Sequence, residues 1–246
     1  MVSPVWSYLK ASMRALVSFR GSFLISGISM TLTNMMLFLP LYFLSAQYNG
    51  FGVLTHELVT MGLAISLLSY TIGINFTSGI VDLQEIILSG ELDKLLLRPI
   101  SVYKHLLIYR INSWMLGEVI GSIILLLLNP ISSWPIIILL GISGGILFNH
   151  IAILANISPL FVRQDREHSF WETIIAFSIY PPTLFPEFGR IISLYILPGA
   201  MTAYGGILIL IDPSYSWIYF GFIALIVAIT HLLLHFGIRK YTSAGY

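Results

Sequence analysis

The sequence predicts an all-α membrane protein with six transmembrane helices, and three observations lead to this fold class. Hydrophobic residues make up 57% of the chain and charged residues only 9%, whereas a soluble domain carries about 25% charged residues. The mean hydropathy is +0.90. The apolar residues also form long runs, and 246 residues leave room for about six spans of roughly 20 residues each. We expect one membrane domain over residues 1–246 and no soluble domain.

The first 20 residues have apolar side chains near helical spacing, with Lys10 and Arg14 between them. This pattern predicts an amphipathic elbow helix over residues 1–20 that lies on the membrane surface. A disordered basic tail is the alternative. The apolar run over residues 21–46 is much longer than the roughly 7–15 residues of a signal-peptide core, so we expect it to remain as the first span.

Five more apolar runs predict the remaining spans. They cover residues 58–80, 106–128, 136–159, 170–184 and 214–237. The short polar link over residues 47–55 contains Asn49, Gly50 and Gly52, which are typical of a turn between two antiparallel helices.

The positive charges support a cytoplasmic location for both termini. With the amino terminus inside, only Arg190 of the 12 Lys and Arg residues lies on the outer side. The inner segments hold Lys10, Arg14, Arg20, Lys94, Arg98, Lys104, Arg110, Arg163, Arg166, Arg239 and Lys240. An excess of Lys and Arg on cytoplasmic segments is the usual determinant of membrane orientation.

Residues 185–212 are apolar, but Pro198 and the glycines that follow it interrupt them. We expect a broken, re-entrant or surface-lying hairpin on the outer side, before the sixth span. A seventh full span in this region would place Arg239 and Lys240 outside, against the charge pattern.

The most charged stretch of the chain lies between the second and third spans, over residues 82–104. Its charged residues are Asp82, Glu85, Glu91, Asp93, Lys94, Arg98 and Lys104. Ser89 can cap a short helix that Pro99 ends, and its apolar side would hold Leu92, Leu95 and Leu96. Such a helix at the cytoplasmic surface is suited to contact another protein. A solvated loop without a partner is the alternative.

One acidic residue, Glu118, lies inside the third apolar run. A carboxylate there costs a few kcal/mol unless it is paired or hydrated. Gly117 and Gly121 beside it would let another helix approach closely. Glu118, Asn75 and Tyr180 are candidates for a substrate path or a dimer interface. A neutralised or hydrogen-bonded structural carboxyl is the alternative for Glu118.

Two further patterns suggest chemistry that has a simpler explanation. His231 and His235 are one helical turn apart and could bind a metal, but neutral histidines near the inner end of a span explain them as well. The run from Gly141 to Gly144 resembles the Gly-x-Ser-Gly motif of rhomboid-type intramembrane proteases, with Ser143 as nucleophile and a histidine as base. Small residues in a span are also expected for helix packing.

The chain has no P-loop, because no lysine precedes Ser or Thr. It therefore cannot bind and hydrolyse ATP by that route, and we expect no catalytic residues and no bound metal. If the protein moves a substrate at the expense of ATP, the ATPase must be another subunit.

Over essentially its whole length the chain resembles permeases of the ABC-2 transporter superfamily, in the bacterial group formerly catalogued as a domain of unknown function. The resemblance rests on four motifs. They are residues 90–101, Tyr180-Pro181, Leu197-Pro198-Gly199 and the tail over residues 239–245. The outer region after Gly199 departs from the family, which usually has another proline near the next helix; Pro213 stands near that place.

The resemblance implies a non-enzymatic permease subunit of an export-type ABC transporter in the bacterial cell membrane. Its partners would be ABC ATPase subunits and a second identical or related permease, with ATP and Mg on the ATPase and no cofactor in this chain; no nucleic acid is implied. The residues between spans 2 and 3 would form a coupling helix on the ATPase, through Glu85, Glu91, Leu92, Asp93, Lys94, Leu95 and Arg98. Spans 2 and 5 would contact the substrate. A gradient-driven secondary transporter and an intramembrane serine protease are the alternatives.

Overall fold

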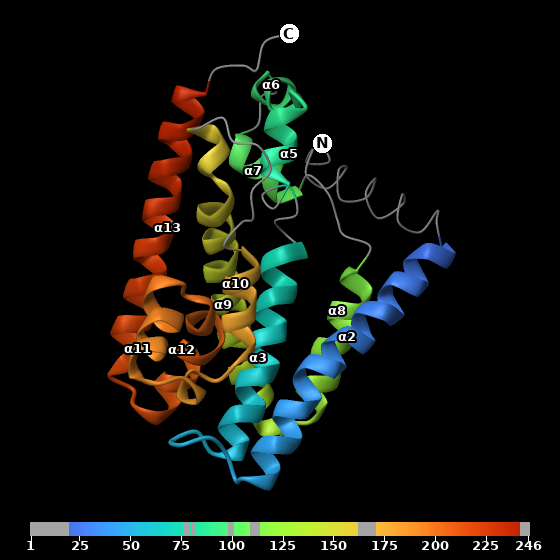
Figure 1. Ribbon diagram of the computed structural model, residues 1–246, viewed down its shortest axis with the longest axis vertical. Coiled ribbons are helices and arrows are strands. Elements are labelled where there is room, and N and C mark those ends of the chain that lie inside the picture. Colours follow the sequence, from blue (N-terminus) through green and yellow to red (C-terminus); the bar gives the residue numbers. More distant parts are fainter. Residues whose placement is uncertain are drawn as a thin grey trace.

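The computed structural model describes residues 20–75, 79, 82–97, 101–108, 114–161 and 171–241. These residues form helices joined by short links, and their only β pairing is an isolated bridge between Phe51 and Leu54. The longer helices run broadly along the long axis of the molecule (Figure 1). The elbow helix expected over residues 1–20 lies outside the described residues except for Arg20, which begins the first long helix.

Four described helices are long and apolar enough to cross a membrane, and they match four of the expected spans. They are α2 (Arg20–Gln47), α3 (His56–Asn75), α9 (Trp134–Asn156) with the preceding turn η1 (Ile131–Ser133), and α13 (Tyr215–Lys240). The link between α2 and α3 turns through Asn49, Gly50 and Gly52, all with positive φ. The predicted first, second, fourth and sixth spans are therefore confirmed as helices. The end of the second predicted run lies largely outside the described residues.

The third and fifth expected spans are described only in part. In the third run, over residues 106–128, the described helices are α7 (Val102–Ile108) and α8 (Met115–Leu127), and residues 109–113 lie outside the described part. In the fifth run, α10 (Trp171–Ile179) ends before Pro181 and Pro182, and η3 (Pro182–Leu184) follows. A helix cannot continue through two prolines without losing backbone hydrogen bonds. The α-helix of the fifth run therefore ends at Ile179, beside the Tyr180-Pro181 motif and before the approximate bound of residue 184.

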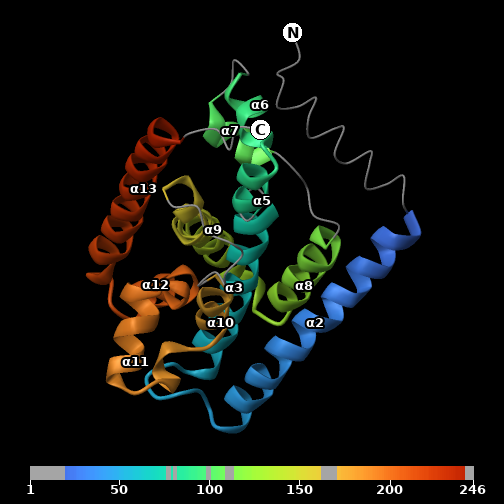
Figure 2. The same cartoon turned by 45° about the horizontal axis from the view of Figure 1, so that its top comes forward.

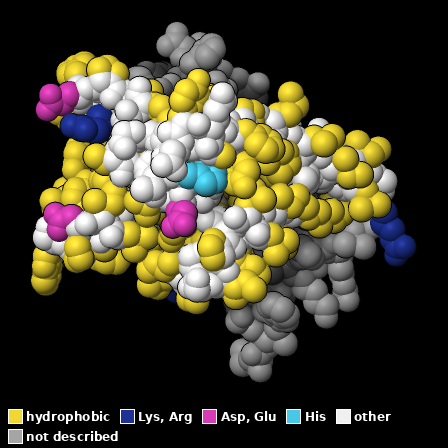
Figure 3. All heavy atoms as spheres, turned by 90° about the horizontal axis from the view of Figure 1, so that it is seen from below, with side chains coloured by type: hydrophobic (Ala, Val, Ile, Leu, Met, Phe, Trp, Pro, Cys, Tyr) yellow, Lys and Arg dark blue, Asp and Glu magenta, His cyan; other side chains and the backbone are white. Residues whose placement is uncertain are grey.

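The interruption expected in residues 185–212 is present as a sharp bend. The segment formed by α11 (Glu187–Ile191) and η4 (Ile192–Ile196) meets α12 (Gly199–Ile211) at 101°. Pro198 precedes α12, and Gly199 lies so close to α10 that an added Cβ would be 2.1 Å from the Ile174 carbonyl oxygen. The bent pair lies at the end of the molecule away from α5 (Leu83–Leu88) and α6 (Glu91–Leu96) (Figure 1). Figure 3 shows that this end is mostly hydrophobic, with a few scattered charged side chains.

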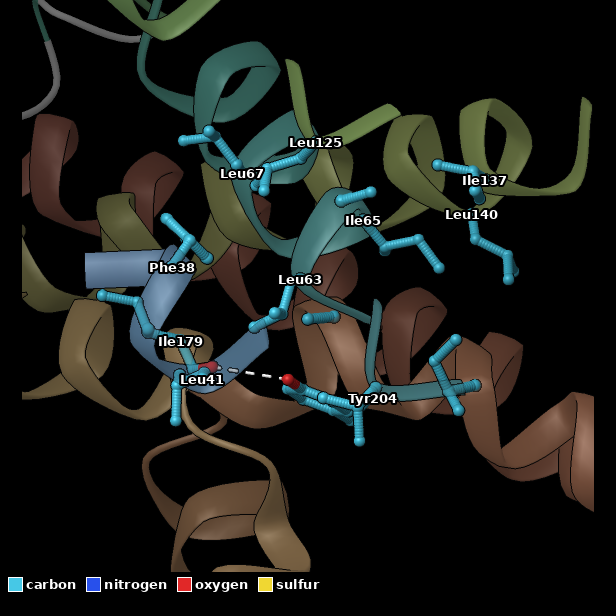
Figure 4. Close-up of a cluster of buried hydrophobic side chains, with 14 of the residues drawn as sticks. Phe38, Leu41, Leu63, Ile65, Leu67, Leu125, Ile137, Leu140, Ile179 and Tyr204 are labelled. Carbon is cyan, nitrogen blue, oxygen red and sulfur yellow. Dashed lines mark hydrogen bonds between the residues drawn. The ribbon is translucent and has the colours of Figure 1, made fainter. Parts of the chain in front are cut away.

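The central helix is α3, which packs against α9, α8 and α12. The main apolar core, which includes Tyr204 of α12, surrounds it (Figure 4). The Tyr204 ring fills the space beside Gly62. The Tyr204 hydroxyl donates a hydrogen bond of 3.4 Å to the Ile179 carbonyl. A second core lies between α5, α6 and the end of α9, next to the turn η2 (Ser158–Leu160).

Close helix contacts depend on glycines, and Gly144 of α9 gives the sharpest test. A Cβ there would lie 2.0 Å from the Thr202 carbonyl oxygen and 2.3 Å from Ser69 Oγ, whereas Gly221 of α13 has open space. We expect Gly144→Ala to lower the free energy of unfolding by about 1–3 kcal/mol because α12 must move away. The matched change Gly221→Ala should be neutral or slightly stabilising, because Ala favours a helix. Thermal unfolding of the purified chain in detergent would contradict this packing if both variants behaved alike.

Candidate functional site

The charged stretch between α3 and α8 forms two short helices rather than the single helix that the sequence suggested. They are α5 and α6, and they lie at one end of the molecule together with α7 (Figures 1 and 2). Gly90 joins them in the left-handed conformation, with φ of 69°. Ser89 does not cap α6, because it ends α5: its backbone N–H donates to the Glu85 carbonyl and its hydroxyl to the Ile86 carbonyl.

The leucines of this segment divide into an inner and an outer pair. Leu92 and Leu95 are 0% and 3% exposed and belong to the second core. Leu96 and Leu97 are 40% and 88% exposed. Leu96 was expected on the same side of the helix as Leu92 and Leu95, and it lies at the exposed edge of that side. Leu92 and Leu95 therefore attach the segment to the rest of the chain and do not face outward.

The charged residues of this segment lie around its outer side. Glu85 and Lys94 are exposed, while Glu91 and Asp93 are half-buried at the start of α6. Arg98 lies outside the described residues. We call the exposed group formed by Glu85, Lys94, Leu96 and Leu97 the coupling surface. It combines both signs of charge with two exposed apolar side chains, which suits a specific contact with a complementary protein surface.

Asn75 and Glu118, singled out separately in the sequence, meet between α3 and α8. Asn75 Nδ2 donates a hydrogen bond of 2.6 Å to Glu118 Oε2 and one of 2.8 Å to the Thr71 carbonyl oxygen. Ser122 of α8 bonds to the Thr71 hydroxyl at 3.0 Å. We call these four residues the polar cluster. Glu118 is 0% exposed, so in this conformation it faces neither another chain nor an open path.

The glycines beside Glu118 have the packing role that their spacing predicted. A Cβ at Gly117 would lie 2.3 Å from the Gly27 carbonyl oxygen of α2. A Cβ at Gly121 would lie 3.0 Å from Leu67 of α3. The two glycines therefore let α8 fit closely between α2 and α3. Tyr180 is not part of this arrangement: it follows α10, is 42% exposed, and makes no hydrogen bond to Asn75 or Glu118.

An apolar cleft of about 70 Å³ lies between α2, α3 and α10. Its polar lining comes from Thr33, Asn34, Ser66, Tyr70 and Ser178. Asn34 is 3% exposed, and its Nδ2 has no acceptor. The sequence analysis did not identify Asn34. The available signal was an amide side chain in the middle of an otherwise apolar run.

The side chains considered for metal binding or proteolysis have other partners in the structure. Ser143 Oγ lies 2.9 Å from the Tyr219 hydroxyl and also donates to the Leu140 carbonyl, so it forms no pair with a histidine. The His231 ring packs against the rings of Tyr103 and His150. Among the described residues no group of three or more His, Cys, Asp or Glu side chains could hold a metal ion.

Comparison with known proteins gives one match. The family model described as "ABC-2 family transporter protein" matches residues 28–245. No curated protein and no solved structure matches the chain.

The division of the leucines at the coupling surface can be tested by their effects on stability. Leu92→Ala should lower the free energy of unfolding by about 2–5 kcal/mol, because it leaves a cavity in the second core. Leu97→Ala should change it by no more than about 0.5 kcal/mol, because that side chain is exposed. Thermal unfolding of both purified variants is the measurement. Equal losses would show that Leu97 is packed as firmly as Leu92.

Proposed function

Because the chain belongs to the ABC-2 family of transporter proteins, we propose that it is the permease subunit of an export-type ABC transporter, driven by a separate ATPase subunit. The observation that carries this proposal is the coupling surface. Two short helices present exposed charges and leucines at one end of a multi-pass membrane protein, while their inner leucines are locked into its core. The ATPase would supply ATP and Mg, and this chain would hold no cofactor.

The anchoring of α6 explains how movement of an ATPase would reach the membrane helices. Leu92 and Leu95 pack in one core with Ile153 and Ile157, at the end of α9. Protein cores are close-packed and transmit displacement with little compression. A push on the coupling surface would therefore move α5 and α6 together with the end of α9, and α9 packs along the central helix α3. Opening of a path between two permeases would follow as a rigid-body movement of helices.

The cleft between α2, α3 and α10 is the place proposed for the first contact with substrate. It is apolar, with polar side chains from Thr33, Asn34, Ser66, Tyr70 and Ser178 in its lining. Ligand sites typically combine an apolar lining with a few polar groups that fix orientation. A substrate with an apolar body and a few polar groups would fit this lining.

We place the coupling surface in the cytoplasm of a bacterial cell, with both termini on the same side. The positive charges of α6, α7 and the end of α13 lie at one end of the molecule (Figure 1), which agrees with the positive-inside rule. Exposed apolar side chains along α2 and α13 would face lipid or a second permease, identical or related.

The alternatives have less support. A gradient-driven transporter would need Glu118 to exchange its proton with water on both sides of the membrane in turn, and in this conformation Glu118 is enclosed. A serine protease would need a general base beside Ser143, but the Ser143 hydroxyl is hydrogen-bonded to the Tyr219 hydroxyl.

Affinity purification of the tagged chain from its native membrane tests the proposed partner. A P-loop ATPase should co-purify with the unchanged chain. The double change Glu85→Lys with Lys94→Glu should reduce its recovery by roughly tenfold or more, because docking charges become mismatched. The same exchange at the exposed residues Glu187 and Arg190, on the opposite end, is the matched control and should have no effect. Undiminished recovery with the first variant would remove the coupling surface as the docking site.

A further inference from the structure

Two oxygen atoms of the polar cluster have no hydrogen-bond donor. They are Glu118 Oε1 and Asn75 Oδ1, and both are buried. The same two side chains are already joined by a hydrogen bond from Asn75 Nδ2 to Glu118 Oε2. A buried polar atom without a partner is costly, and here two of them belong to one interacting pair.

The nearby donors are already used. The two hydrogens of Asn75 Nδ2 go to Glu118 Oε2 and to the Thr71 carbonyl. Turning the amide over would put Asn75 Oδ1 against that carbonyl, so the orientation is fixed. The Thr71 hydroxyl donates to the Leu67 carbonyl at 2.8 Å. Its oxygen then accepts the hydrogen of Ser122. No donor of the polar cluster remains for the two oxygens.

No described cation compensates a negative charge on Glu118. Arg20 stands at the start of α2, and His56 and Glu57 lie at the far end of α3. In the described part of α8, Glu118 is the only charged residue. Tyr70 of α3 is the titratable side chain that interacts with it electrostatically. An isolated carboxylate is therefore far more costly here than a neutral carboxylic acid.

We propose that Asn75 and Glu118 form a proton-binding site within the membrane, in which one proton on Glu118 Oε1 is donated to Asn75 Oδ1. Asn75 Nδ2 donates to Glu118 Oε2 at the same time, so acid and amide close a ring of two hydrogen bonds. A single proton satisfies both remaining oxygens.

This site lies between α3 and α8. In the chain these two helices precede and follow α5–α7, which carry the coupling surface. The bound proton holds α3 against α8. Loss of the proton leaves a carboxylate with an unpaired oxygen, which favours entry of water and separation of these helices. The site does not depend on any ATPase being docked, so the purified chain is sufficient to test it.

Comparing Glu118→Gln with Glu118→Ala tests whether Glu118 is a neutral acid or a carboxylate. In Glu118→Gln the amide hydrogen takes the place of the proposed proton, so the midpoint of thermal unfolding should stay within about 2 °C of the unchanged chain. Glu118→Ala removes both bonds and leaves Asn75 unsatisfied, and its midpoint should fall by roughly 4–8 °C. Ser122→Ala removes a hydroxyl of the same cluster that is not part of the ring, and is the matched control.

Infrared difference spectroscopy of the full chain in lipid nanodiscs at pH 7 provides a second measurement. The carboxylic-acid carbonyl band should be present in the unchanged chain and in Ser122→Ala, and absent in Glu118→Gln. This comparison remains decisive even if Glu118→Ala does not fold. Three results would overturn the proposal: absence of the acid band, destabilisation of Glu118→Gln as large as that of Glu118→Ala, or unfolding that depends on sodium concentration. The first two indicate a hydrated carboxylate, and the third a bound cation.

Discussion

Close packing around α3 is the constraint on which the rest of this structure depends. Lipid is as apolar as the side chains it replaces, so helices in a membrane associate through tight contacts and interhelical hydrogen bonds. Here Gly62 receives Tyr204, Gly73 receives Phe148, and the Ser69 hydroxyl lies within hydrogen-bonding distance of the carbonyls of Gly141 and Thr202. Two neighbouring helices, α9 and α12, are thereby held at short range from one central helix. Movement of either of them must be shared by α3.

Because of this packing, a displacement of the coupling surface would be passed on to the membrane helices. A charged loop on flexible tethers could bind a partner without moving anything. The segment after α3 is instead fixed from within by Leu92 and Leu95, while Leu97 stays outside. The same short stretch thus contains an anchor and a contact side. The polar cluster lies between α3 and α8, the two helices that precede and follow this segment. There Asn75 of α3 donates a hydrogen bond to Glu118 of α8.

Much of this fold was predictable because it follows from average properties of long segments. Runs without charge predict the four long helices, and these are present in the structure. The distribution of Lys and Arg predicts their orientation, which stays a prediction. The prediction failed where one residue decides the backbone, since Gly90 divides α5 from α6. It could not find Asn34, or the contact of Asn75 with Glu118, because both depend on how separate helices turn toward each other. Residue spacing within one helix does not contain that information.

The central claim is that the coupling surface contacts an ATPase, and cross-linking tests it most directly. The chain has no cysteine, so Leu97→Cys would carry a single thiol at an exposed position. Phe188→Cys, 74% exposed on α11, is the matched thiol at the opposite end. A short thiol-to-amine cross-linker applied to native membranes should join Leu97→Cys to a P-loop ATPase, identified by mass spectrometry, and should leave Phe188→Cys unlinked to it. An ATPase captured from position 188, or from neither position, would contradict the account.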